Sequence, residues 1–154
     1  MSIFTDQEQE TIDALREAGF EDGDIPALMG NISVETGGTF DPMQQEEGGS
    51  GSGLFQFSGN HLKAYKSWLK GNGFADNAHN QALFVHSNVY SKDSPYNLGW
   101  KAKGLLQNVL GGDLYFVSTE EKARIFSDFY QKPGVPHMDR RQEEALRYEG
   151  MLAP

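Results

Sequence analysis

The sequence predicts one α+β domain, mainly α-helical, with a small β-hairpin after its second helix. Its 154 residues suit a single domain over residues 1–154, and no linker-like stretch divides them. Apolar residues recur at helical spacing along most of the chain. One Gly-rich segment between residues 37 and 53 interrupts that spacing. These observations favour a series of short helices around one irregular segment.

The first two helices are defined by residues that begin and end helices. Residues 5–8 (Thr-Asp-Gln-Glu) form a capping-box pattern, and the helix that they open ends at Gly19. The second helix begins near Asp24, has Pro26 in its first turn and ends at Gly37. Its apolar residues fall at i, i+3, i+4 and i+7: Ile25, Leu28, Met29 and Ile32.

The segment after the second helix predicts the hairpin. Residues 39–57 contain an acidic pair, a Gly/Ser run over 48–53 and a short apolar, aromatic stretch over 54–57. A Gly/Ser run followed by such a stretch is typical of a loop or hairpin with one or two short strands. We expect this segment to be the β part of the domain.

Helical spacing resumes after this segment and continues towards the C-terminus. Helices are expected over residues 62–70, 78–89, 105–109, 119–132 and 136–150. A second capping-box pattern at residues 118–121 opens the fourth of these helices, and Pro133 closes it.

The composition excludes several classes of protein. The chain has no cysteine, so neither disulfides nor thiol chemistry are available to it. Its net charge of −9 argues against nucleic-acid binding, and no apolar run is long enough for membrane insertion. The first residues have neither a basic stretch nor an apolar core, so we expect that they are not a secretory signal. We therefore expect the protein to fold in a cytoplasm.

Glu35 is the candidate catalytic residue. It lies seven residues after Leu28 and three after Ile32, which on a helix places it on the apolar face in the last turn. Burial and the negative end of the helix dipole both raise the pKa of a carboxyl there. A carboxyl that is protonated near neutral pH suits proton donation to a leaving sugar oxygen. On spacing alone, however, a Glu that reaches into solvent is the commoner outcome.

Two segments of the chain resemble a known family. Residues 30–42, Gly-Asn-Ile-Ser-Val-Glu-Thr-Gly-Gly-Thr-Phe-Asp-Pro, and residues 51–57, Gly-Ser-Gly-Leu-Phe-Gln-Phe, resemble the lysozyme superfamily and most closely the phage tail lysozyme family. Goose-type lysozymes and soluble lytic transglycosylases share related Glu-Ser and Gly-Leu-Met-Gln signatures. Here Thr36, Asp41 and Phe57 stand where the family pattern usually has Ser, Asn and Trp.

A second patch extends the resemblance. Residues 123–145 resemble the C-terminal part of the same family, so the likeness spans roughly residues 25–150. The resemblance implies a lysozyme-like fold and a muramidase that needs no cofactor. Such an enzyme cleaves the β-1,4 bond between N-acetylmuramic acid and N-acetylglucosamine, with Glu35 as its general acid.

A glycosidase usually needs a second carboxylate, which activates water or stabilises charge on the sugar ring. Glu46 and Glu47 lie in the segment that is expected to face Glu35, and the sequence does not decide between them. Asp41 ranks third, because it precedes Pro42 and is expected to turn the backbone. Solvation at the surface is the alternative for each of these carboxylates.

Substrate contacts are expected from the same region. The resemblance places Gln56 on the floor of a cleft, where it would hydrogen-bond substrate or a catalytic water. Phe55 and Phe57 alternate along their segment, so one is expected to face the core and the other the cleft. Aromatic residues near helix ends are more often part of the core than sugar-stacking surfaces. The further candidates for substrate contact are Thr36, Tyr90, Tyr96 and Trp100.

The histidines do not suggest a metal site. His79 and His86 could share a helix face, but no third ligand accompanies them. Neither a metal nor a cofactor is therefore expected. Residues 31–33 match a glycosylation sequon, which has no meaning inside a helix of a protein that is made in a cytoplasm.

Three functional hypotheses remain open. The first is a hydrolytic muramidase, the second is a lytic transglycosylase that uses Glu35 alone, and the third is an inactive wall-binding component of a phage tail. The expected partners are peptidoglycan glycan strands and other phage tail proteins. The expected location is the virion, at the phage tail, or the host cytoplasm before release, with action on the bacterial cell wall in the periplasm. An endolysin for host lysis is the alternative to a tail enzyme.

Overall fold

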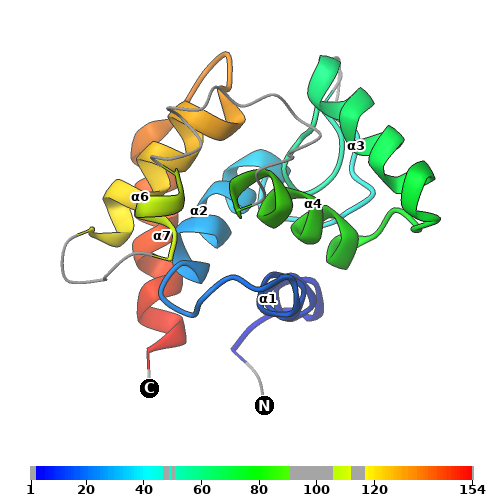
Figure 1. Cartoon of the computed structure of the whole chain (residues 1–154). Helices are drawn as coiled ribbons and strands as arrows, with labels where there is room; N and C mark the ends of the chain where they lie inside the picture. The colour runs from blue at the N-terminus through cyan, green and yellow to red at the C-terminus, as the bar shows by residue number, and fades with distance from the viewer. Residues whose placement is uncertain (1–2, 47–48, 50, 91–105, 112–116, 154) are drawn as a thin grey trace.

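The computed structural model describes residues 3–46, 49, 51–90, 106–111 and 117–153, and most of them are helical. In chain order the elements are α1 (Asp6–Ala18), α2 (Ile25–Thr36), α3 (Gly59–Asn72), α4 (Ala78–Tyr90), α6 (Thr119–Phe126), the π-helical turn η1 (Ser127–Gln131) and α7 (Met138–Leu152) (Figure 1). Residues 106–109 form a further helical turn, and Leu105 lies outside the described residues. The predicted mainly helical architecture is confirmed.

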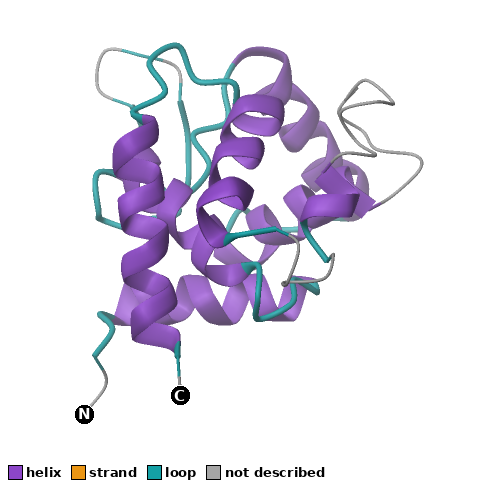
Figure 2. Cartoon of the chain, turned by 90° about the vertical axis from the view of Figure 1, so that its left-hand side faces the viewer, coloured by secondary structure: helices purple, strands orange, loops and turns teal. Residues whose placement is uncertain are grey.

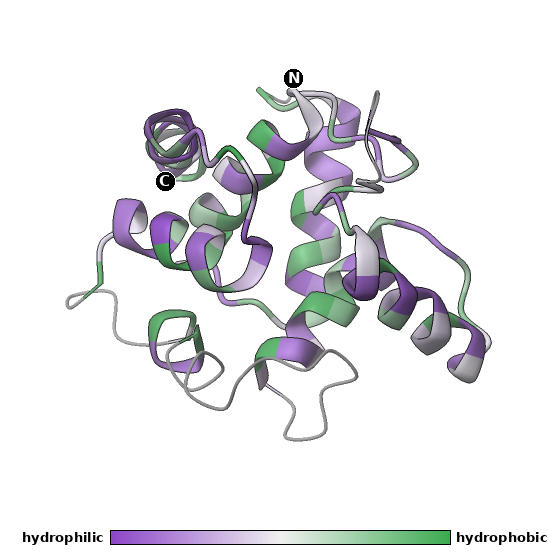
Figure 3. Ribbon diagram, turned by 90° about the horizontal axis from the view of Figure 1, so that it is seen from above, coloured by the Kyte–Doolittle hydropathy of each residue, from purple (hydrophilic) through white to green (hydrophobic). Residues whose placement is uncertain are grey.

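Helix α2 is the central element of the fold. Every residue from Ile25 to Ser33 is buried, and α2 makes its most extensive contacts with α7 while also packing on α1 and α6. Helix α4 packs on α1 and α3. Figure 3 shows hydrophobic residues gathered on helices in the middle of the molecule and hydrophilic residues towards its outside. Among the described helices, none has the length and apolar character that crossing a membrane requires.

Gly30 allows α2 and α7 to approach each other closely. A Cβ at this position would lie 2.6 Å from the backbone nitrogen of Ala145 and 2.7 Å from the carbonyl oxygen of Arg141. Both atoms belong to the backbone of α7 and cannot give way as a flexible side chain can. The absence of a side chain at Gly30 therefore sets the distance between these two helices at the level of Arg141.

The predicted helix ends are confirmed at α1 and α2. Thr5 and Glu8 form the reciprocal capping box, in which each side chain accepts a hydrogen bond from the other residue's backbone N–H. Gly19 and Gly37 adopt the left-handed conformation that ends each helix, with φ values of 113° and 62°. The capping residues therefore predict these boundaries from the sequence alone.

The helix expected over residues 119–132 is shorter than predicted. Helix α6 ends at Phe126, the backbone widens into η1, and Lys132 leaves the helix with a φ of 47°. Pro133 follows directly, and its ring disfavours the right-handed helical conformation in the residue before it. The π-helical turn brings Gln131 and Lys132 to the wall of the cavity described below.

The predicted β-hairpin is wrong. The described part of residues 39–58 contains no strand, only two isolated antiparallel bridges, Gln45 with Ser52 and Ser52 with Phe57 (Figure 2). Gly53 and Gln56 have φ values of 80° and 50°, which interrupt the extended backbone that a ladder requires. The segment therefore folds as a series of turns packed against the end of α2.

A buried ion pair joins α6 to the start of α2. Lys122 Nζ lies 2.6 Å from Asp24 Oδ1, and the two side chains are 0% and 1% exposed. Burial raises the pKa of Asp24, while Lys122 opposes that rise. Because an unpaired charge at this depth is costly, the pair holds α6 in place beside α2.

Candidate functional site

A cavity of about 530 Å³ opens at the C-terminal end of α2. Three parts of the chain surround it: the last turn of α2, Glu46 with residues 55–58, and residues 131–141 at the junction of η1 and α7. Residues 131–141 are far from α2 in the sequence and reach its end because α7 packs along α2. A cavity of this size and polarity suits a small polar ligand or a short stretch of a polymer.

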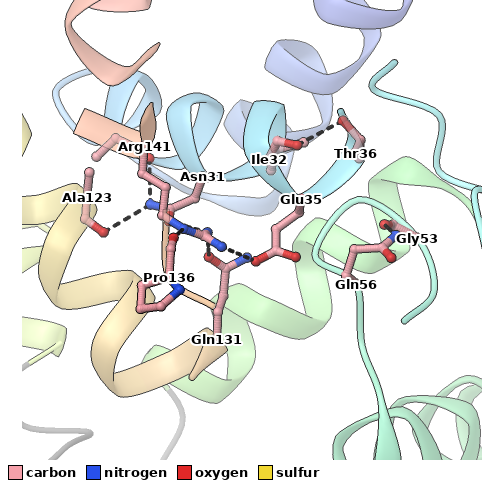
Figure 4. Close-up of polar contacts among 11 residues, drawn as sticks. Asn31, Ile32, Glu35, Thr36, Gly53, Gln56, Ala123, Gln131, Pro136 and Arg141 are labelled. Carbon is pink, nitrogen blue, oxygen red and sulfur yellow. Dashed lines mark hydrogen bonds and ion pairs between the residues drawn. The ribbon is translucent and has the colours of Figure 1, made fainter. Parts of the chain in front are cut away.

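Glu35 lies on the wall of this cavity, in the last turn of α2. Its side chain is 14% exposed, and its Oε1 accepts a hydrogen bond from Arg141 Nη2 at 2.7 Å (Figure 4). The side chain of Arg141 is 2% exposed. The two groups therefore form a charge-assisted contact between α2 and α7 that is largely shielded from solvent.

Two opposing effects act on the pKa of Glu35. Burial raises it and is the larger effect, whereas the guanidinium of Arg141 lowers it through charge and hydrogen bonding. Nearby Glu46 raises the pKa further, and His137 lowers it. The net direction is upward, so this carboxyl keeps its proton to a higher pH than an ordinary Glu does.

Arg141 holds several segments of the site at once. Its Nη1 donates to Asn31 Oδ1 at 2.8 Å and to Gln131 Oε1 at 3.0 Å, and its Nε donates to the carbonyl of Pro136 (Figure 4). Together with the bond to Glu35, these contacts use four of the five N–H groups of a guanidinium. One side chain therefore fixes residues from α2, η1 and the loop before α7.

Asn31 in turn fixes Arg141. It is fully buried, and its Nδ2 donates to the carbonyl oxygens of Ala27 at 3.0 Å and Ala123 at 3.1 Å. Those two acceptors require the NH₂ group on that side, so the amide oxygen must face the guanidinium. The orientation of Arg141 is thereby determined from α2 and α6 together.

The contact with Arg141 also determines which oxygen of Glu35 carries the proton. A guanidinium has donors only, so Oε1 must serve as an acceptor. A carbonyl oxygen is a better acceptor than a hydroxyl oxygen, so this contact favours the neutral carboxyl with its proton on Oε2. In Figure 4 the second oxygen points away from Arg141, towards the turn that carries Gln56.

Glu46 lines the same cavity. Its Oε2 accepts a hydrogen bond from the backbone N–H of Gly51 at 2.9 Å. A Cβ on Gly51 would lie 2.8 Å from this oxygen and 2.5 Å from Oε1 of Gln56. The Gly-rich run therefore makes room for two cavity side chains. Glu47, the other predicted partner, lies outside the described residues.

Gln56 also lines the cavity, as the resemblance implies for its position. Its backbone has a φ of 50°, and its Nε2 donates to the carbonyl of Gly53 at 2.7 Å. This short-range bond leaves little freedom for the side chain. The structure therefore brings together Glu35, Glu46 and Gln56 around one cavity.

The other predicted contact residues are placed differently. Phe55 lines the cavity, although it is 3% exposed and stacks on Phe57 in the core. Phe57 and Thr36 are buried and do not line the cavity; the hydroxyl of Thr36 donates to the carbonyl of Ile32. Tyr90 donates to the carbonyl of Leu110, also away from the cavity. Two further candidates, Tyr96 and Trp100, lie outside the described residues.

Asp41 has a local structural role. It is exposed, and its Oδ1 accepts a hydrogen bond from the backbone N–H of Met43 at 2.9 Å. This contact supports the turn at Pro42, as the sequence predicts. Asp41 is not one of the cavity residues.

Unfavourable backbone conformations concentrate at the cavity. Among the described residues other than glycine, four have a positive φ: Phe40, Gln56, Lys132 and His137. The last three line the cavity. Such conformations cost about 1–3 kcal/mol each and persist only where the surrounding structure imposes them. Their concentration here supports a functional role for this region.

The cavity also contains Arg141, Gln131 and His137, which the sequence did not indicate as site residues. The spacing of Arg141, Ala145 and Tyr148 at i, i+4 and i+7 places the arginine on the buried face of α7, where both other residues are buried. An arginine on a buried helix face requires hydrogen-bond acceptors in the interior. This spacing could therefore have indicated that Arg141 binds buried polar groups. In the described part of the chain, no group of three or more His, Cys, Asp or Glu residues could hold a metal ion.

Comparison with known proteins yields one family. A family model described as phage tail lysozyme matches residues 6–152, nearly the whole chain. The match covers each of the segments that surround the cavity. No curated protein and no solved structure matches the chain.

Replacing Arg141 by Met should raise the pKa of Glu35 further. Burial raises the pKa of Glu35, and the guanidinium of Arg141 is the main group that lowers it. Without the guanidinium, the effect of burial on this pKa is largely unopposed. Carboxyl ¹³C NMR of Glu35 during a pH titration measures this directly. Arg140→Met, at an exposed neighbour on the same helix, is the control and should leave the titration of Glu35 unchanged.

The loss of Arg141 also removes a buried partner, and breaking such a pair costs about 3–5 kcal/mol of stability. Arg141→Lys keeps the charge and should give a pKa between those of the wild type and the Met variant. An unchanged or lowered pKa of Glu35 in both folded variants would contradict the electrostatic account of this site.

Proposed function

This chain belongs to the phage tail lysozyme family, and we propose that it hydrolyses the β-1,4 bond between N-acetylmuramic acid and N-acetylglucosamine in peptidoglycan. In this proposal residues 1–154 form one catalytic domain, and Glu35 is the general acid. One observation supports the proposal most strongly: the carboxyl of Glu35 has a raised pKa and borders a polar cavity of suitable size.

The proposed first step is proton transfer from Oε2 of Glu35 to the glycosidic oxygen. The bond between the anomeric carbon and that oxygen then breaks, and positive charge develops on the sugar ring. Glu35 becomes a carboxylate at the same moment. Arg141, 2.7 Å from Oε1, stabilises this new negative charge more than it stabilises the neutral acid.

This role sets the direction of the pH dependence. The acid must be protonated, so activity should fall as the pH rises through the pKa of Glu35. Because burial raises that pKa, the active range extends to a higher pH than an ordinary Glu would allow. Asn31, Gln131 and Pro136 act as positioning groups, since they touch Arg141 and not the reacting atoms.

Glu46 is the proposed second carboxylate. It lines the cavity, and the hydrogen bond that it accepts from the backbone N–H of Gly51 holds its side chain there. A carboxylate there would polarise an attacking water or stabilise the positively charged sugar. Glu47 remains a candidate for the same role. A transglycosylase would instead use the 6-hydroxyl of muramic acid as the nucleophile and would not need either residue.

The proposed setting is a phage tail, where the enzyme opens the wall locally during infection. The match to the phage tail lysozyme family supports a location at the phage tail. The net charge of −9 agrees with it, because a negative enzyme is not drawn through solution to an anionic wall. Attachment to other tail proteins would replace long-range attraction by a high local concentration.

Glu35→Gln should reduce peptidoglycan cleavage by roughly 100-fold or more, because Gln keeps the shape of the side chain but has no acidic proton. Clearing of a peptidoglycan suspension measures the rate. Glu143→Gln, an exposed residue on α7, removes the same charge and should cleave at the wild-type rate. Wild-type activity in a folded Glu35→Gln protein would contradict the assignment of the acid.

Glu46→Gln should lower kcat by roughly 10-fold or more with little change in KM, since the lost interaction belongs to the transition state. The same measurement on Glu47→Gln and on the double variant decides which carboxylate contributes. Mass spectrometry of the products gives an independent answer. Products with a 1,6-anhydro ring, together with an unaffected double variant, would show transglycosylation instead of hydrolysis.

The protein should be present in purified phage particles. Proteomics of gradient-purified virions, compared with the lysate from which they came, measures this. Enrichment in particles with the tail proteins is the expected result. Presence in the lysate alone would favour an endolysin that is released at host lysis.

A further inference from the structure

Two basic side chains line the cavity and have no part in the steps of the proposed reaction. Lys132 and His137, which we call the cationic wall, both line the cavity and are both exposed. Arg141 also lines the cavity, but its charge is paired with Glu35. Within the described residues, neither member of the cationic wall takes part in an ion pair with an acidic group.

The cationic wall is held in a fixed position. Lys132 and His137 have φ values of 47° and 49°, and Pro133 and Pro136 restrict the backbone between them. The backbone N–H of Lys132 donates to the carbonyl of Ser127 at 2.7 Å. At the other end, the carbonyl of Pro136 accepts from the buried Nε of Arg141. Both ends of the wall are thus attached to the rest of the site.

Both acidic and basic side chains therefore line the cavity. Glu35 and Glu46 line the same cavity as the cationic wall, and Glu35 has Arg141 as its own partner. The whole chain has a net charge of −9, so basic side chains at the cavity, with no acidic partner in the described part of the chain, run against the overall balance. A ligand that carries a negative group on a neutral sugar backbone suits these two basic side chains, which have no acidic partner among the described residues.

We propose that the cationic wall binds a carboxylate carried by the muramic acid residue next to the bond that is cut. This inference rests on the proposed function, because it names the part of the substrate that the same cavity recognises. Muramic acid bears a lactyl ether, which ends in a carboxylate or in a peptide with carboxylates of its own. N-acetylglucosamine bears neither group. The wall therefore orients the two kinds of sugar relative to Glu35.

Binding is the most direct test, because it does not depend on catalysis. The Glu35→Gln protein serves as the background, with Lys132→Gln and His137→Gln added together. Calorimetry at low salt gives Kd for three probes. They are a peptide-free oligosaccharide with lactyl carboxylates, the same glycan with its peptides, and a chitin oligosaccharide of equal length without carboxylates.

The double change should weaken binding of the peptide-free muramic glycan by about 10-fold, as expected for losing a charge-assisted contact, and added salt should reduce this difference. Binding of the chitin oligosaccharide should not change. The matched control, Lys63→Gln with His79→Gln, lies on α3 and α4 outside the cavity and should have no effect. A loss confined to the peptide-bearing glycan would assign the wall to a peptide carboxylate.

Equal weakening for all three probes, or no change for either muramic glycan, would overturn the proposal. Cleavage by the protein with Glu35 intact is measured separately on peptidoglycan. Normal cleavage with an unaffected Kd would contradict the wall and leave the proposed function standing. Selective loss of muramic glycan binding in a protein that cleaves nothing would support the wall and contradict the proposed catalysis.

Discussion

The buried guanidinium of Arg141 is the constraint on which the rest of the site depends. A cation at 2% exposure requires acceptors on every side, and α2, η1 and the loop before α7 each supply one or more. Gly30 lets α7 come close enough to α2 for these bonds to form. The packing of the two helices and the position of Glu35 are therefore consequences of the same contact.

The same contact explains how an acid can remain near a cation and still hold a proton. Burial penalises the ionised form of Glu35 more than Arg141 favours it, so the pKa rises. Without burial the guanidinium would keep the carboxyl ionised. Without the guanidinium the carboxylate formed after proton transfer would have no partner. The site combines both effects and so suits a group that must change its charge during the reaction.

Much of the fold could be predicted from the sequence, because local chemistry determines it. The capping box at Thr5, the left-handed glycines and the apolar repeats give helices α1 and α2 with nearly the observed ends. The position of Glu35 on the buried face of α2 follows from the same spacing. These features depend on neighbours within a few residues, which a sequence shows directly.

The features that could not be predicted depend on contacts between distant residues. The hairpin does not form, because Gln56 adopts a left-handed backbone that no local propensity indicates. The pairing of Arg141 with Glu35 spans more than 100 residues and appears only when α7 packs on α2. Thr36 and Phe57 stand at positions of a family pattern that usually has Ser and Trp there, and the structure places both of them in the interior.

A crystal structure of the Glu35→Gln protein with a bound muramic acid-containing tetrasaccharide would test the central claim most directly. The account predicts that the glycan occupies the cavity and that a glycosidic oxygen lies about 3 Å from the side chain of residue 35. A glycan bound elsewhere, for example in the groove between α1 and the start of α4, with no sugar near this side chain, would contradict it.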